Sequence, residues 1–142
     1  MIRPIDDKIS VAPQISVEEV AEIAAAGFVA IINNRPDGED FGQPTGAEIR
    51  AAAEAAGLSY TEIPVTHAGF SGNQVEAMAA ALEAANGPVL AYCRSGTRST
   101  LLWALVRAKA GDDADVIAAS AADAGYDVAP IRPLIDHLGR GR

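Results

Sequence analysis

The single cysteine of the chain, Cys93, lies between an apolar run and a stretch with helical periodicity. Residues 88–92 are mostly apolar, as in a strand covered on both faces, and Leu101, Leu102 and Leu105 recur at helical spacing. A strand–loop–helix turn directs backbone N–H groups and the positive end of a helix at one spot, which makes a natural anion site. We therefore expect Cys93 to be a thiolate nucleophile rather than a small buried core residue.

The residues that follow Cys93 are suited to holding an anion. Arg98 closes the loop, and its planar guanidinium can make a bidentate contact with an oxyanion. Gly96 allows the backbone to curl. Ser99 either donates to the sulfur or caps the helix, and Arg94 is as compatible with an outward position as with a functional one. The expected anion-binding residues are Arg94, Ser95, Gly96, Thr97, Ser99 and, from another loop, Arg35.

A nucleophile that expels a leaving group usually needs an acid. His67 is a candidate because it lies in a loop that we expect to overhang the pocket, although a surface role is equally compatible. Asp37 is a second candidate acid. It lies with Glu39 in a Pro-Asp-Gly-Glu turn, so turn chemistry alone also explains both carboxylates. No pair of residues has metal-ligand spacing, and we expect neither a metal nor another cofactor.

Composition places these residues in one acidic domain. The chain has 142 residues and a formal net charge of −8, so we expect a single domain over residues 1–142 and no nucleic-acid partner. One cysteine allows no internal disulfide and no cysteine-rich zinc site. No apolar stretch is long enough to span a membrane, and Asp6 and Asp7 do not fit a signal peptide. We expect a cytoplasmic protein without a membrane partner.

Alternating strands and helices predict an α/β fold with a mostly parallel sheet of four or five strands and helices on both faces. The expected strands are 9–11, 28–32, 58–65 and 88–92, after an irregular lead-in over residues 1–8. Three helices should begin at capping boxes at Ser16, Thr45 and Ser71, and further helices should follow Cys93, cover 113–124 and form a last turn at 134–138. Ligands of such sheets bind beyond the carboxyl ends of the strands, so loops 33–40, 66–70 and 93–98 should converge.

The segment Tyr92–Ser99 (YCRSGTRS) closely resembles the active loop of single-domain rhodaneses, in which a cysteine carries sulfane sulfur as a persulfide. The wider pattern of Asn33–Glu39, Tyr60–Val65 and the cysteine loop resembles dual-specificity protein phosphatases. Together, over roughly residues 5–138, these features are similar to the phosphatase-like domain of bacterial beta-lactamase-hydrolase-like proteins, often labelled a sulfur transferase. The resemblance implies a protein-tyrosine-phosphatase-like fold and a possible persulfide dioxygenase partner.

The cysteine loop departs from the phosphatase signature, which is His-Cys, five residues, then Arg. Here Tyr92 replaces the histidine, and only four residues separate Cys93 from Arg98. A tighter ring should suit one extra sulfur better than a phosphoryl group. We therefore expect a sulfurtransferase that forms a Cys93 persulfide, with thiosulfate or glutathione persulfide as donor and a thiol or cyanide as acceptor. The alternatives are a phosphatase that forms a cysteinyl-phosphate from a phosphate ester, and a non-catalytic anion-binding regulatory module.

Overall fold

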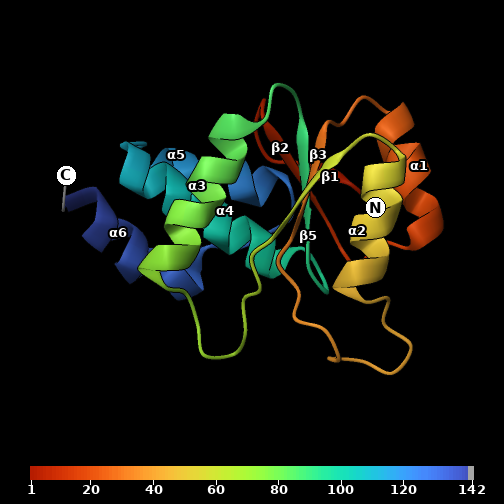
Figure 1. Cartoon of the computed structure of the whole chain (residues 1–142). Coiled ribbons are helices and arrows are strands. Elements are labelled where there is room, and N and C mark those ends of the chain that lie inside the picture. The colour runs from red at the N-terminus through yellow and green to blue at the C-terminus, as the bar shows by residue number, and fades with distance from the viewer. Residues whose placement is uncertain (141–142) are drawn as a thin grey trace.

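The computed structural model describes residues 1–140 and contains one five-stranded sheet between two layers of helices (Figure 1). The strands are β1 (Arg3–Pro4), β2 (Ile9–Ala12), β3 (Ala30–Asn33), β4 (Ser59–Glu62) and β5 (Val89–Tyr92). Their order is β1-β2-β5-β3-β4; β1 runs antiparallel to β2, and all other pairs are parallel. The predicted α/β fold with a mostly parallel sheet is confirmed. Strand β1 was missed within the lead-in, since two residues show no periodicity.

The helices cover both faces of the sheet, as the alternating pattern predicts. They are α1 (Val17–Ala25), α2 (Gly46–Ala55), α3 (Gly72–Ala84), α4 (Thr97–Ala110), α5 (Ala114–Asp123) and α6 (Arg132–Arg140), with a 3-10 turn η1 at Ala129–Ile131. Helices α1 and α2 lie on one face, and α3 to α6 lie on the other (Figure 1). Helix α6 is longer than the predicted last turn. No helix within residues 1–140 has the length and apolar character needed to cross a membrane.

All three predicted capping boxes are present. At the start of α1, the Glu19 N–H donates to Ser16 Oγ at 3.1 Å, and the Ser16 N–H donates to Glu19 Oε1 at 2.8 Å. The same reciprocal pair begins α2 and α3. Each box satisfies backbone donors that have no partner inside the helix, which fixes where the helix begins.

Strand β4 is shorter than the predicted strand 58–65 and lies at the edge of the sheet. It ends at Glu62, two residues before Pro64, because proline cannot donate to a strand ladder. The chain then leaves the sheet at its carboxyl edge. In Figure 1, the two long loops that follow β3 and β4 project from this same lower edge, to which β5 also leads.

Helix α4 is the centre of the thicker layer. Every residue from Ser99 to Val106 is buried, because α3, α5 and α6 surround the helix. Residues 101–106 are apolar on every side of the helix, and such a stretch must be covered in this way. Its N-terminus directly follows β5, the central strand, so the turn between them is held on both sides by buried structure.

Candidate active site at the carboxyl edge of the sheet

Cys93 lies immediately after β5, and its side chain is fully buried. Its Sγ accepts the backbone N–H of Gly96 at 3.1 Å. Gly96 precedes α4 and has φ of +90°, a conformation that costs glycine little. The sulfur therefore receives a backbone N–H at the positive end of a fourteen-residue helix whose middle is buried, an arrangement that favours an anionic sulfur.

Arg98, in the first turn of α4, is held by a carboxylate from the loop after β3. Its Nη1 and Nη2 donate to the two oxygens of Glu39 at 2.8 and 2.7 Å, and Nη1 also donates to the Val65 carbonyl at 2.8 Å. A bidentate pair of this kind fixes the plane of the guanidinium. Loops after β3 and β4 thus meet the cysteine loop, as their exit from one sheet edge predicts.

Glu39 is ionised at neutral pH. The hydrogen bond from Arg98, assisted by one from Arg35, lowers the pKa of Glu39 to about 2, although burial acts in the opposite direction. Glu39 in turn raises the pKa of Arg98 above its usual value, and the neighbouring Cys93 contributes to the same shift. Glu39 therefore orients Arg98 and is not suited to donating a proton.

Arg35 is buried and does not point freely into a pocket. Its Nε donates to Glu39 at 2.9 Å, its Nη2 to Asp40 at 2.7 Å and its Nη1 to Gln14 at 3.0 Å. Arg35 thus braces the loop that carries Glu39, and its role as a second anion contact stays a prediction. Arg94 is exposed and pairs with Asp40 at 3.3 Å, so its side chain lies over this loop rather than beside the sulfur.

Within residues 1–140, neither candidate acid hydrogen-bonds to Arg98 or Glu39. Asp37 accepts the Gly46 N–H at 2.8 Å, so it holds the start of α2 and is not directed at Cys93. His67 is exposed in the turn after Val65. The carboxylate that contacts Arg98 is therefore Glu39, two positions after the candidate acid Asp37 in the same turn.

The hydroxyl side chains of the cysteine loop also differ from expectation. Ser99 is buried, and its Oγ donates to Asn34 Oδ1 at 2.8 Å rather than to Cys93. Helix α4 has Gly96 and not Ser99 as its N-cap. Ser95 and Thr97 are exposed and hydrogen-bond to each other at 2.9 Å, so these two can serve an anion mainly through their backbone.

Two residues near the cysteine loop were missed from the sequence. Gln14 follows β2 at the carboxyl edge; besides holding Arg35, its backbone N–H donates to the Arg94 carbonyl at 3.3 Å. Its place after a strand was a usable signal. Tyr126 follows α5, and its hydroxyl donates to the Ser95 carbonyl at 3.1 Å. No local pattern marks Tyr126, because the contact spans 31 positions.

Tyr92, where phosphatases have histidine, is fully buried and packs against the α1–α2 layer. Burial raises the pKa of Tyr92 well above its usual value, so the phenol is neutral. The residue before Cys93 therefore supplies packing and no positive charge. Within residues 1–140, no group of three or more histidine, cysteine or acidic side chains is arranged to hold a metal ion.

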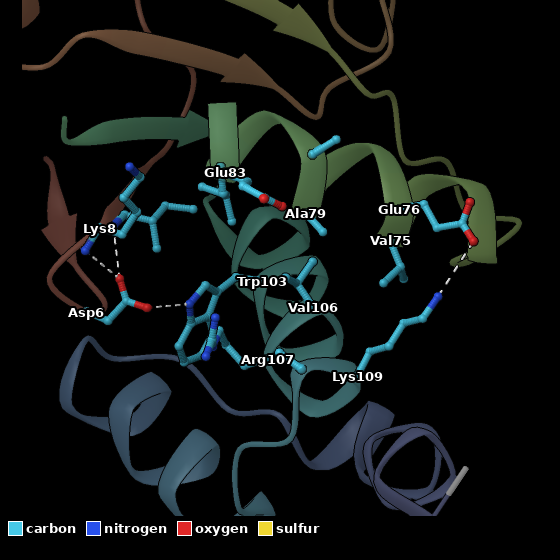
Figure 2. Close-up of a pocket in the computed structure, with 14 residues that line it drawn as sticks. Asp6, Lys8, Val75, Glu76, Ala79, Glu83, Trp103, Val106, Arg107 and Lys109 are labelled. Carbon is cyan, nitrogen blue, oxygen red and sulfur yellow. Dashed lines mark hydrogen bonds and ion pairs between the residues drawn. The ribbon is translucent and has the colours of Figure 1, made fainter. Parts of the chain in front are cut away.

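A separate groove of about 690 Å³ lies between α3, α4 and the β1–β2 turn, as Figure 2 shows. Trp103 forms part of its wall and donates from Nε1 to Asp6 at 2.9 Å. Asp6 also accepts the N–H groups of Lys8 and Ile9, so its carboxylate is satisfied within the fold. The groove contains neither Cys93 nor any predicted site residue, and it is not the candidate active site.

Comparison with known proteins identifies relatives over most of the chain. The family model described as "Beta-lactamase hydrolase-like protein, phosphatase-like domain" matches residues 1–110. A beta-lactamase hydrolase-like protein of Agrobacterium fabrum is 37% identical over 107 residues, which cover 75% of this chain and 25% of the relative. Its counterpart in Xylella fastidiosa is 37% identical over 101 residues, covering 71% and 23%. The chain thus spans about a quarter of the length of these curated relatives.

Solved structures match nearly the whole chain. A candidate phosphatase from Neisseria meningitidis has 36% identity and a TM-score of 0.85, covering 96% of this chain and 97% of its own. Tk-PTP has 17% identity and a TM-score of 0.78, covering 98% and 96%. TpbA of P. aeruginosa, in complex with pTyr, has 17% identity and a TM-score of 0.68, covering 99% and 88%. The last two confirm the predicted protein-tyrosine-phosphatase-like fold. The relatives favour the phosphatase interpretation over the sulfur transfer expected from loop length.

Proposed function

Because the chain belongs to the family of beta-lactamase hydrolase-like phosphatase-like domains, we propose that it is a cysteine-dependent enzyme that hydrolyses a phosphate monoester. One observation carries the proposal: Cys93 and Arg98 lie on one strand–loop–helix turn, with the sulfur accepting a backbone N–H and the guanidinium fixed by Glu39. The 36% identity to a candidate phosphatase of nearly equal length supports the same reaction.

Arg98 retains donors for an oxyanion. Its contacts with Glu39 and Val65 use both N–H groups of Nη1 and one of Nη2. An arginine has five N–H groups, so the Nε–H and the second Nη2–H remain, side by side on one edge of the fork. This edge matches two oxygens of a phosphoryl group, while the backbone of 94–98 and the α4 terminus provide further stabilisation.

The proposed reaction has two displacement steps at phosphorus. The Cys93 thiolate attacks phosphorus, the ester P–O bond breaks, and the leaving oxygen takes a proton. Water then attacks the cysteinyl-phosphate, the P–S bond breaks, and inorganic phosphate and the thiolate are released. Glu39 cannot protonate the leaving oxygen at neutral pH, because it is a carboxylate with a pKa of about 2. Aryl phosphates, whose leaving groups need little protonation, should therefore be better substrates than alkyl phosphates.

His67 is the proposed proton donor for less reactive leaving groups. It lies in an exposed turn two residues beyond Val65, whose carbonyl accepts from Arg98. His67→Gln should slow the hydrolysis of alkyl phosphates more than that of aryl phosphates. If alkyl and aryl phosphate hydrolysis slow equally, His67 is not the proton donor.

Sulfur transfer is the second candidate function, and the loop length favours it. Four residues separate Cys93 from Arg98, and the thiol has no exposed surface, so a single sulfur atom needs the least rearrangement. In this reaction the thiolate attacks the outer sulfur of thiosulfate and the S–S bond breaks. Sulfite is released, and Cys93 becomes a persulfide. An acceptor thiolate then attacks the terminal sulfur and releases the Cys93 thiolate.

One side-by-side assay separates the functions. Wild-type protein, Cys93→Ser and Arg98→Lys are incubated with p-nitrophenyl phosphate, and separately with thiosulfate followed by intact mass measurement. We expect phosphate release by the wild type, none by Cys93→Ser, and a clear reduction in Arg98→Lys, since a point charge replaces the fork. A reductant-sensitive gain of one sulfur without phosphate release would select sulfur transfer. Neither activity would select the non-catalytic module.

A further inference from the structure

Tyr126 contacts the cysteine loop from a part of the chain beyond the family match over residues 1–110. It lies between α5 and η1, and its side chain is half-buried. Its hydroxyl donates to the Ser95 carbonyl at 3.1 Å. Burial is the main reason that the pKa of Tyr126 is raised, with Cys93 contributing and Arg3 opposing. The hydroxyl is therefore protonated at neutral pH and is available as a donor.

The bond from Tyr126 reaches Cys93 through a single peptide group. The Ser95 carbonyl and the Gly96 N–H belong to the same peptide, and that N–H donates to Cys93 Sγ at 3.1 Å. A hydrogen bond accepted at the oxygen polarises the peptide and strengthens donation from its nitrogen. It also opposes rotation of the peptide plane, which would turn the N–H away from the sulfur.

Gly96 fits closely against Tyr126. A Cβ at position 96 would collide with the Tyr126 hydroxyl oxygen, and φ of +90° already favours glycine there. On its other side, the Gly96 carbonyl accepts from Thr100 Oγ1 at 2.9 Å and from the Thr100 N–H at 3.0 Å. Both peptide groups that flank the Gly96 Cα are therefore fixed, one by α4 and one by Tyr126.

We propose that Tyr126 is a positioning residue that locks the Ser95–Gly96 peptide with its N–H toward Cys93 and so favours the anionic sulfur. The proposal rests on the proposed function in one respect, namely that Cys93 is the nucleophile. Other groups also act on the sulfur. Arg98 faces it from α4, with Glu39 behind, whereas Arg94 is turned outward onto Asp40.

Tyr126→Phe tests the lock, because it removes one oxygen and keeps the ring. Tyr60→Phe is the matched control, since Tyr60 is also partly buried but its hydroxyl hydrogen-bonds to Asn33 of β3 and Glu62 of the edge strand β4. Thiolate ultraviolet absorbance is titrated for each protein against its own Cys93→Ser counterpart, and alkylation by iodoacetamide is timed at a pH below the wild-type thiolate transition. For Tyr126→Phe we expect the thiolate transition to move upward by about half a pH unit and alkylation to slow about threefold. Tyr60→Phe should change neither.

The readouts separate this inference from the proposed function. A Tyr126→Phe titration that coincides with the wild type would overturn the lock, whatever the enzyme hydrolyses. A shifted titration in a protein without phosphatase activity would retain the lock and reject phosphate hydrolysis. A purely structural tyrosine would lower the melting temperature without moving the titration, and this result would also overturn the proposal.

A double-mutant cycle with Gly96→Ala tests the contact independently. The alanine carries the strain of positive φ in either background, but only the wild type presents the hydroxyl that its Cβ would meet. The fall in melting temperature caused by Gly96→Ala should be smaller in the Tyr126→Phe background. Equal falls in both backgrounds would show that the hydroxyl does not press on Gly96 and would count against the lock.

Discussion

At the scale of single residues, Glu39 determines how Arg98 is presented. It accepts from Arg98 through both oxygens and from Arg35 through one, so two guanidinium groups depend on one carboxylate. Glu39 and the two arginines are largely shielded from water, which strengthens their attraction relative to that of an exposed ion pair. Glu39 thus orients Arg98, although a carboxylate in this turn could also have been a catalytic acid by its type alone.

Glu39→Gln should lower stability at neutral pH by about 1–3 kcal/mol, because charge-assisted hydrogen bonds to two arginines are weakened. The pKa of Glu39 falls from 4.5 to about 2 on folding, so its stabilising contribution is complete well above pH 4.5 and is lost as the pH falls toward 2. Urea unfolding of both proteins across this range measures the effect. The difference between wild type and variant should be constant near neutrality and should shrink between pH 4.5 and 2.

Asp115→Asn is the matched control for this measurement. Asp115 also pairs with an arginine, Arg132, but the two side chains are 84% and 39% exposed. Solvent screens such a pair, so the variant should change stability by no more than about 0.5 kcal/mol. If Glu39→Gln lowers the free energy of unfolding no more than Asp115→Asn does, the hydrogen bonds of Glu39 do not stabilise the fold as their geometry indicates.

At the scale of elements, the turn between β5 and α4 sets both the length of the cysteine loop and the direction of Arg98. Helix α4 begins at Thr97, so Arg98 already belongs to the first helical turn. Its position relative to Glu39 therefore depends on helical phase. The residues before Gly96 belong to the loop and can change in number without turning the helix.

Two one-glycine insertions should consequently differ. An insertion after Thr97 rotates Arg98 by about 100° around the helix and should abolish both phosphate hydrolysis and sulfur transfer. An insertion after Arg94 lengthens only the loop, to the spacing typical of phosphatases, and should raise the ratio of phosphate hydrolysis to sulfur transfer. The two assays of the proposed function measure this ratio. Indistinguishable insertions would mean that helical phase does not control Arg98.

At the scale of the whole molecule, α4 joins the active-site loop to the main hydrophobic core. Leu102 is fully buried within this core, together with residues of β2, β5 and α3. Leu102→Ala should therefore cost about 2–5 kcal/mol, since it removes buried contacts and leaves a cavity. Leu134→Ala, at a position that is 37% exposed, should cost far less. Thermal unfolding of both variants checks this order; similar losses would contradict the central place of α4.

The sequence by itself determined those features that depend on neighbouring residues in the chain. Capping boxes, the strand–loop–helix turn at Cys93 and the alternation that predicts a mostly parallel sheet all arise from local spacing and side-chain type. The convergence of loops followed from topology, because parallel strands end at one edge. The short β1 lacks such a signal.

The tertiary structure decided which side chains meet at that edge. Arg98 meets Glu39 across 59 positions, Ser99 meets Asn34 across 65, and Tyr126 meets Ser95 across 31. Asp37 and Glu39 lie two positions apart in one turn and carry the same functional group, but they have different partners. The contacts of this loop with Arg35 and with the start of α2 decide their partners. Glu39 binds Arg98, whereas Asp37 accepts from the first residue of α2. Such choices depend on contacts between distant segments, and no local pattern contains them.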